Sequence, residues 1–214
     1  MQPLVWLLIR ALEFSLLFIA MPLAIYYRFI PNAPISYLLL GALAAFLVLR
    51  RDPTFPGARL ISWDGTGPHL LPLFLRDAAC LLLLALAVRL FAPELLFSFV
   101  KRAPVFWALV MLLYPLVSVY PQELLFRAFF FHRYQPLFGN GWGMVLVSAL
   151  AFGFVHIIFG NRLAVILSIL GGFLFSLTYS QTGSLLVTCL DHAIFGNFLF
   201  TIGLGQFFYH GSRP

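Results

Sequence analysis

Long apolar segments make up most of the chain, and short clusters of charged, proline and glycine residues separate them. The segments are helix-length and lack the alternation of polar and apolar residues that a membrane barrel requires. They predict an all-α fold, a polytopic transmembrane helical bundle of about seven spans, with six to eight as the range. The expected spans are 3–27, 35–49, a third centred on 78–88, 104–134, 143–159, 163–179 and 185–208.

Polar residues in the N-terminal half mark the limits of the first spans. No small-residue cleavage site follows the first apolar run, so we expect a retained span and not a signal peptide. Within that run, Arg10 and Glu13 are three apart and are expected to pair near the helix start. Proline, glycine and charge in 51–69 predict a long loop, and Arg76 is assigned to the same side of the membrane as this loop.

The composition fits a membrane-embedded protein. Of the 214 residues, 62% are hydrophobic and only 9% are charged, whereas a soluble domain has about 25% charged residues. We expect a single membrane-embedded domain over 1–214. The net charge of +6 comes from scattered basic residues, which favour contact with the lipid bilayer and its anionic headgroups and give no case for nucleic acid.

The central stretch 121–134, PQELLFRAFFFHRY, places ionisable residues in one of the most apolar parts of the chain. A charged side chain deep in a bilayer costs about 2.5 kcal/mol or more, so such residues are rare and usually functional. Glu123 and Arg127 are four apart and share one face of a helix, as either a structural ion pair or part of a site. Pro115 and Pro121 are expected to interrupt the helix and leave a small polar cavity beside it.

Two histidines lie in later spans. His156 is near the end of the fifth span, with Phe152 one turn earlier on the same face, and His192 is in the last span. Each alone could be a histidine bonded to a neighbouring helix. Together with Glu123 they form a possible hydrolytic unit, because a carboxylate accepts a proton from water and a histidine donates to the oxyanion. The chain contains no H-E-x-x-H, G-x-S-x-G or CxxC motif.

The ordered motifs resemble the CAAX prenyl-protease and Abi group of intramembrane glutamic proteases, the CPBP family. That family shows E-E-x-x-x-R, then F-x-x-x-H, then a helix entered through Thr-Gly-Ser and carrying H-x-x-x-N. Here the corresponding segments are 122–127 (QELLFR), 152–156 (FGFVH) and 182–184 (TGS), which leads to His192. The resemblance covers about 104–205 as a motif-bearing catalytic core.

The resemblance implies an intramembrane endopeptidase that cuts a membrane-anchored or C-terminal peptide substrate. It also implies a multi-pass protein of the bacterial cell (inner) membrane. No cofactor is expected, because a glutamate mechanism needs no metal and the chain has few anionic ligands for zinc.

Two positions depart from the family pattern. Gln122 stands where the family has the first glutamate, which is usually taken as the base. Gly196 stands where the family has Asn, and Asn197 is one residue further. Five residues correspond to about 500° around a helix, so Asn197 is rotated about 140° from His192 and needs a distorted helix to reach the same site. The departures predict either a shifted site or an inactive relative.

The mechanism expected from these residues uses Glu123 as the general base and His156 to hold the attacking water. His192 stabilises the oxyanion, and Arg127 keeps Glu123 ionised and in position. These side chains are expected to line one water-accessible cavity.

Three further residues have supporting roles in this hypothesis. Gln122 and Phe152 orient water or substrate, and Asn197 assists His192 from the edge of the cavity. Two alternatives stay open: an inactive membrane scaffold or immunity-type binding protein, and a proton-coupled carrier, since buried Glu and His also form proton relays.

Overall fold

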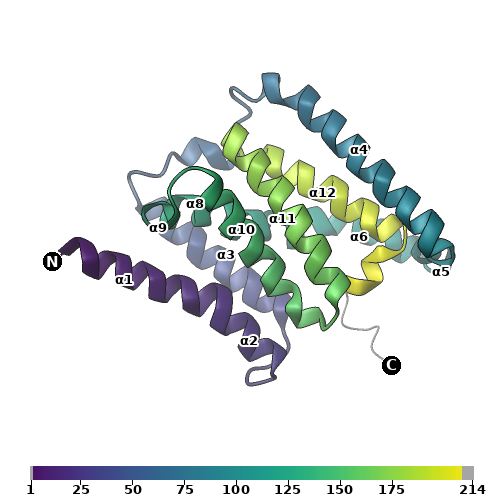
Figure 1. Cartoon of the computed structure of the whole chain (residues 1–214), viewed down its shortest axis with the longest axis horizontal. Coiled ribbons are helices and arrows are strands. Elements are labelled where there is room, and N and C mark those ends of the chain that lie inside the picture. Colours follow the sequence, from purple (N-terminus) through teal and green to yellow (C-terminus); the bar gives the residue numbers. More distant parts are fainter. Residues whose placement is uncertain (1, 209–214) are drawn as a thin grey trace.

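The structure is a computed structural model that describes residues 2–208, with side chains from residue 4 onward. This part of the chain consists of helices joined by turns (Figure 1). Six of its helices are long and apolar enough to cross a membrane, and the shorter apolar helix Leu185–Thr201 follows them. The prediction of an all-α polytopic bundle of about seven spans is therefore confirmed, and the chain is a multi-pass membrane protein.

The helices have the following bounds in chain order: α1 Gln2–Ser15, α2 Met21–Tyr26, α3 Pro34–Arg51, α4 Gly67–Phe91, α5 Ser98–Arg102, α6 Pro104–Tyr114, α7 Tyr120–Glu123, α8 Phe130–Arg133, α9 Gln135–Phe138, α10 Trp142–Val155, α11 Arg162–Thr182 and α12 Leu185–Thr201. The π-helical turns Leu16–Ala20, Pro115–Val119 and Leu124–Phe129 join neighbouring helices into continuous spans. Short 3₁₀ turns occupy Gly57–Leu60, Pro93–Leu95, His156–Phe159 and Leu204–Phe208.

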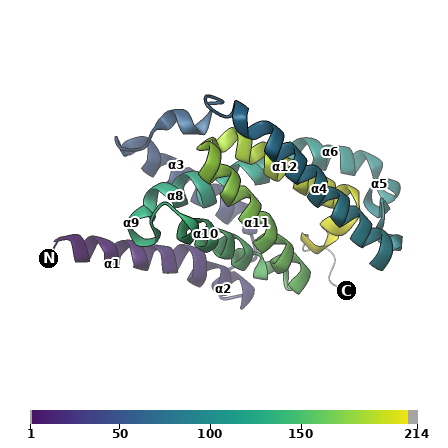
Figure 2. The same ribbon diagram turned by 45° about the horizontal axis from the view of Figure 1, so that its top comes forward.

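Helices α10, α11 and α12 form the centre of the molecule (Figures 1 and 2). Helices α10 and α11 approach closely because glycines face the partner helix: a Cβ on Gly172 would lie 3.1 Å from the carbonyl oxygen of Ala149. The turn between α11 and α12 uses Gly183, whose φ of 62° suits glycine, and Ser184, whose Oγ accepts from the N–H of Val187. This turn is the Thr-Gly-Ser entry expected from the sequence.

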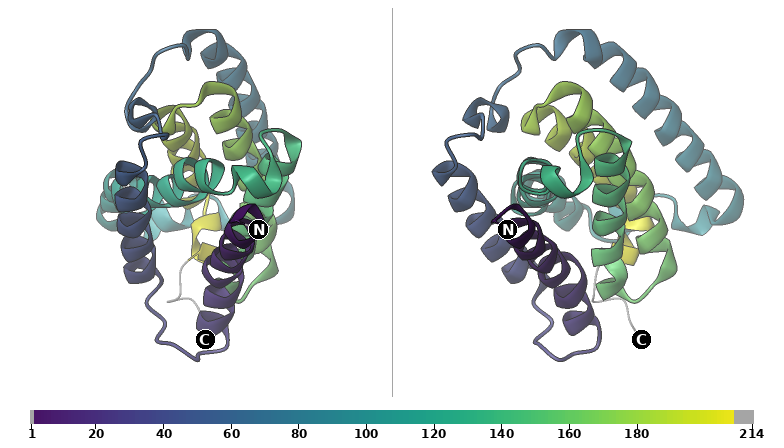
Figure 3. Two further views of the ribbon diagram at one scale, coloured as in Figure 1. Left: turned by 90° about the vertical axis from the view of Figure 1, so that its left-hand side faces the viewer. Right: turned by 60° about the vertical axis from the view of Figure 1, so that its left-hand side comes forward.

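Helices α3 and α4 form opposite sides of the molecule in the right-hand view of Figure 3, with the central helices between them. Helix α4 begins at Gly67, eleven residues before the start of the range 78–88 on which the third span was expected to be centred, because Pro68 at its first turn starts a helix and does not continue the loop. Arg76 is therefore inside a span and not in the loop. Its guanidinium lies 2.7 Å from Asp191 of α12.

The long span from α6 to α8 passes through both of its central prolines. The sequence predicted an interruption at Pro115 and Pro121, but the structure contains one helix over Pro104–Arg133. The π-helical turns Pro115–Val119 and Leu124–Phe129 lie within it. A π turn shifts the backbone hydrogen-bond register by one residue, so the missing proline donors are accommodated without ending the helix.

Glu13 has a different partner from the one the sequence suggested. Its carboxylate accepts from Arg133 of α8 at 2.7 Å and from the hydroxyl of Tyr134 at 3.0 Å. The expected close ion pair with Arg10 is not found, because packing of α1 against the end of the long span brings the guanidinium of Arg133 to the carboxylate.

The loop after α3 starts in a turn that Asp52 holds. Thr54 donates to Asp52 Oδ1 from its backbone N–H (2.9 Å) and from its hydroxyl (2.6 Å), and His132 Nε2 lies 2.9 Å from Asp52 Oδ2. These hydrogen bonds, the Thr54 hydroxyl first, hold the pKa of Asp52 well below its usual range. The turn ties this loop to the end of the long span.

Candidate active site

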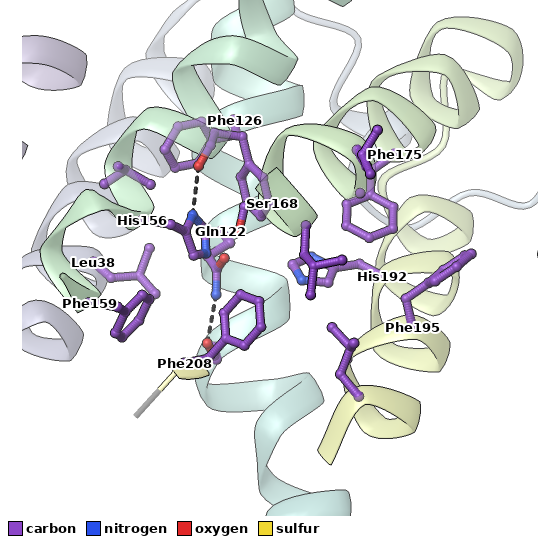
Figure 4. Close-up of a pocket in the computed structure, with 18 of the residues that line it drawn as sticks. Leu38, Gln122, Phe126, His156, Phe159, Ser168, Phe175, His192, Phe195 and Phe208 are labelled. Carbon is purple, nitrogen blue, oxygen red and sulfur yellow. Dashed lines mark hydrogen bonds between the residues drawn. The ribbon is translucent and has the colours of Figure 1, made fainter. Parts of the chain in front are cut away.

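A cavity of about 840 Å³ lies among the helices and is lined mainly by apolar side chains. Its polar lining residues come from four of the spans and one flanking 3₁₀ turn (Figure 4). They are Tyr37, Tyr114, Ser118, Gln122, His156, Ser168 and His192. A mostly apolar cavity with a few convergent polar groups is the usual form of a binding or active site.

Glu123 and Arg127 lie behind the wall of this cavity. Both side chains are fully buried, at 0% exposure, and neither lines the cavity. Arg127 Nε lies 3.3 Å from Glu123 Oε2, a distance that makes an ion pair although the angles do not make a hydrogen bond. Arg127 lies within the π-helical turn Leu124–Phe129 and Glu123 directly precedes this turn, so the expected pairing four residues apart is confirmed.

The other guanidinium nitrogens of Arg127 are bonded to neighbouring helices. Nη1 donates to the carbonyl oxygen of Phe126 and to Ser148 Oγ, both at 3.0 Å, and Nη2 donates to the carbonyl oxygen of Gly172 at 3.3 Å. The guanidinium also lies 5.1 Å from the centre of the Phe152 ring. Arg127 thereby connects the long span to α10 and α11 while its charge balances that of Glu123.

The second oxygen of Glu123 is bonded to His192. His192 Nδ1 lies 2.7 Å from Glu123 Oε1, and His192 Nε2 lies 3.0 Å from the hydroxyl of Tyr114. Since a carboxylate accepts, Nδ1 carries the hydrogen of the first bond. The ring of Phe175 stacks on the imidazole, with centroids 4.4 Å apart. Both nitrogens of His192 are therefore fixed, and its ring orientation is set by packing.

His156 faces the same cavity from the end of α10 and is bonded differently. Its Nδ1 lies 2.7 Å from the carbonyl oxygen of Phe152. A carbonyl oxygen only accepts, so Nδ1 carries the hydrogen and Nε2 of the neutral ring keeps its lone pair. The Phe152 ring contacts both imidazoles, with centroid distances of 4.8 Å to His156 and 5.6 Å to His192. Phe152 thus holds the two histidines at one side of the cavity.

Gln122 lines the cavity, whereas its neighbour Glu123 does not. Its Nε2 donates to Ser118 Oγ at 2.6 Å, one turn earlier in the same span. An amide neither accepts a proton nor carries a charge near neutral pH. Gln122 therefore gives the cavity a hydrogen-bonding group and no base.

Asn197 lies away from the other candidate residues. Its Nδ2 donates to the carbonyl oxygen of Met111 at 3.3 Å, and it is absent from the cavity lining, which includes the preceding Gly196. Helix α12 is regular from Leu185 to Thr201, so the rotation of about 140° from His192 is not removed by a distortion. The structure brings Gln122, Phe152, His156 and His192 to the cavity and leaves Asn197 outside it.

Two features of the site were missed by the sequence reasoning. Tyr114 is an aromatic residue in an apolar span, and no local spacing marks it as a partner of a histidine 78 residues away. The ion pair between Arg76 and Asp191, next to His192, also joins distant segments; Thr178 donates to the same carboxylate oxygen of Asp191. The signal available for this second feature was an unmatched acid and base in two apolar runs.

Within the described residues, no group of three His, Cys, Asp or Glu side chains could hold a metal ion. The free cysteines Cys80 and Cys189 are both partly buried.

Comparison with known proteins finds one family model that matches part of the chain. Residues 104–198 match the family model described as type II CAAX prenyl endopeptidase Rce1-like. No curated protein and no solved structure matches the chain. The matched segment begins at the first residue of α6 and ends in α12, so it includes the helices that position the cavity histidines and Glu123.

Proposed function

Because residues 104–198 match the family model of Rce1-like type II CAAX prenyl endopeptidases, we propose that this chain is an intramembrane endopeptidase that cuts with a histidine-bound water. The observation that carries the proposal is the 2.7 Å bond between Glu123 and His192 at the wall of a cavity that His156 also lines. A buried carboxylate that orients one imidazole, beside a second imidazole with a free nitrogen, is a sufficient arrangement for general acid–base hydrolysis.

The first role concerns the attacking water. Nε2 of His156 is the nitrogen whose lone pair is left open by the bond from Nδ1 to Phe152. It takes a proton from water as the water oxygen forms a bond to the carbonyl carbon of the substrate. The carbonyl π electrons move to oxygen, which becomes an oxyanion. When that intermediate collapses, the C–N bond breaks and His156 returns the proton to the leaving nitrogen, so protons and electrons balance.

The second role concerns the oxyanion. His192 is held in position by its hydrogen bond to Glu123, and the ring stabilises the oxyanion through the positive charge that it carries when both nitrogens are protonated. Glu123 was expected to act directly as the base. Its full burial behind the cavity wall favours a different role, in which it orients His192 while the charge of Arg127 balances its own.

The remaining roles concern binding. Gln122 offers its amide to the peptide backbone of the substrate, and Phe152 keeps the two imidazoles in place. The apolar lining of the 840 Å³ cavity suits a membrane-anchored or C-terminal peptide that enters from the bilayer. A location in the bacterial inner membrane is part of the proposal.

The proposal is tested by comparing cells that produce the unaltered protein with cells that produce His156→Ala. C-terminal membrane peptides in the two membranes are measured by mass spectrometry. We expect at least one membrane protein to keep its uncut C-terminus only in His156→Ala cells. Identical peptide sets together with a fully retained cellular phenotype would favour a non-catalytic membrane scaffold, and solute uptake by proteoliposomes would favour a carrier.

A further inference from the structure

Tyr114 occupies the cavity end of α6 and touches the reacting region through its hydroxyl. The phenol lies 3.0 Å from His192 Nε2 and is part of the cavity lining. Its ring is held edge-on against Phe200, with centroids 5.3 Å apart, and edge-on against His192 at 6.1 Å. The hydroxyl is therefore fixed in position by ring packing on both sides.

Gly196 makes the space for this ring. Gly196 follows His192 by four residues on α12, so both lie on the cavity face of the helix. A Cβ built on Gly196 would lie 2.6 Å from Cζ of Tyr114 and would also overlap Cε1 and the hydroxyl oxygen. Any side chain at position 196 would thus displace the phenol from His192. In the family motif this position carries Asn, whereas here the phenol of Tyr114 occupies the space beside Gly196.

We propose that Tyr114 is a catalytic residue of this chain, whose hydroxyl occupies the space left by Gly196 and donates a hydrogen bond to the oxyanion. This proposal rests on the proposed peptidase function and adds a residue to it. In the imidazolium form of His192, Nε2–H donates to Oη of Tyr114 and leaves the phenolic hydrogen free to point into the cavity. No proton leaves the phenol, so the proton transfers assigned to His156 stay balanced.

The test measures hydrolysis of a farnesylated, internally quenched peptide that ends in a CAAX sequence, using purified protein in liposomes. Tyr114→Phe keeps the ring packing and removes only the hydroxyl. Loss of one oxyanion donor typically lowers kcat about 10²- to 10³-fold, and we expect this loss with little change in KM. Tyr120→Phe is the matched control, because Tyr120 is a half-buried tyrosine of the same long span that does not line the cavity. A Tyr114→Phe enzyme with unaltered kcat overturns the proposal.

Gly196→Ala tests the spatial part of the argument while it leaves the hydroxyl in the chain. We expect kcat to fall as far as in Tyr114→Phe, and unaltered kcat in Gly196→Ala would overturn the steric claim. A second readout is the rate at which diethyl pyrocarbonate modifies His192, followed by mass spectrometry. Removing the hydroxyl frees Nε2, so His192 should react faster in Tyr114→Phe, whereas equal rates would overturn the contact.

The two proposals fail in different ways. If the unaltered protein does not cut the peptide and His156→Ala changes nothing, the peptidase function fails for this substrate, and the labelling rate alone decides the contact between Tyr114 and His192. If the unaltered protein cuts the peptide and His156→Ala does not, while Tyr114→Phe keeps full kcat, only the role of Tyr114 fails.

Discussion

Replacing Arg127 with methionine should destabilise the protein more than the loss of its individual hydrogen bonds suggests. Most of the groups that Arg127 bonds keep other partners: Ser148 Oγ still donates to the carbonyl oxygen of Phe126 at 2.8 Å. Glu123 instead loses the neighbouring positive charge, because its carboxylate is fully buried and Arg127 is the cation beside Oε2. The magnitude is therefore set by an unpaired buried charge.

Breaking a buried ion pair by removing one partner costs about 3–5 kcal/mol of unfolding free energy. We expect this cost for Arg127→Met, measured by denaturant titration of the purified protein in mixed micelles. Arg133→Met is the matched control on the same span. Arg133 pairs with Glu13, but the two side chains are 25% and 27% exposed, and exposed ion pairs contribute about 0–1 kcal/mol.

A double variant separates the charge effect from lost packing. Arg127→Met combined with Glu123→Gln has no buried charge at this pair, and a glutamine oxygen still accepts from His192 Nδ1. The double variant should therefore be more stable than Arg127→Met alone, although it stays inactive. Equal stability of Arg127→Met and Arg133→Met, or a double variant destabilised by the sum of the single changes, would refute the reasoning.

Two further changes test the carboxylates. Glu123→Gln preserves shape and removes the charge that holds His192, so hydrolysis should fall about 100-fold or more in initial-rate assays; full activity in Glu123→Gln with none in Gln122→Ala would show that the assignment is wrong. Asp52→Asn should lower the thermal midpoint at neutral pH, because a carboxylate with a lowered pKa adds stability above its unfolded pKa of about 3.9 and loses it as pH falls through the lower folded value. The difference in midpoint should not decrease from pH 7 to about 4 and should shrink below, and a decline already between pH 7 and 5 would contradict this origin.

The sequence was sufficient for features that depend on local pattern. Helix-length apolar runs predicted the spans, and the four-residue spacing of Glu123 and Arg127 predicted their ion pair, which the structure contains at 3.3 Å. The helical angle between His192 and Asn197 indicated that the two side chains diverge, and α12 has the regular geometry that makes them diverge.

Contacts between residues that are far apart in the sequence could not be predicted from the local pattern of residues. Glu13 pairs with a residue 120 positions away, and Tyr114 meets His192 across 78 positions. No propensity or spacing marks such partners, because helix packing selects them. The effect of the prolines in the long span was misjudged for another reason. The helix continues past them through π-helical turns, which the local rule that proline interrupts a helix does not consider.

Gln122 offers the sharpest test of which residue is the base. In the proposed mechanism His156 takes the proton, and position 122 faces the same cavity with an amide in place of a carboxylate. Gln122→Glu adds a group that can accept a proton there, with Ser118 Oγ beside it to donate to the new carboxylate. General bases typically contribute 10²- to 10⁴-fold, so Gln122→Glu should raise the residual hydrolysis of His156→Ala about 10-fold or more. Gln122→Met in the same background is the control of similar size. If both variants leave His156→Ala equally inactive, proton transfer does not take place at this end of the cavity, and the role of base returns to Glu123 acting through His192.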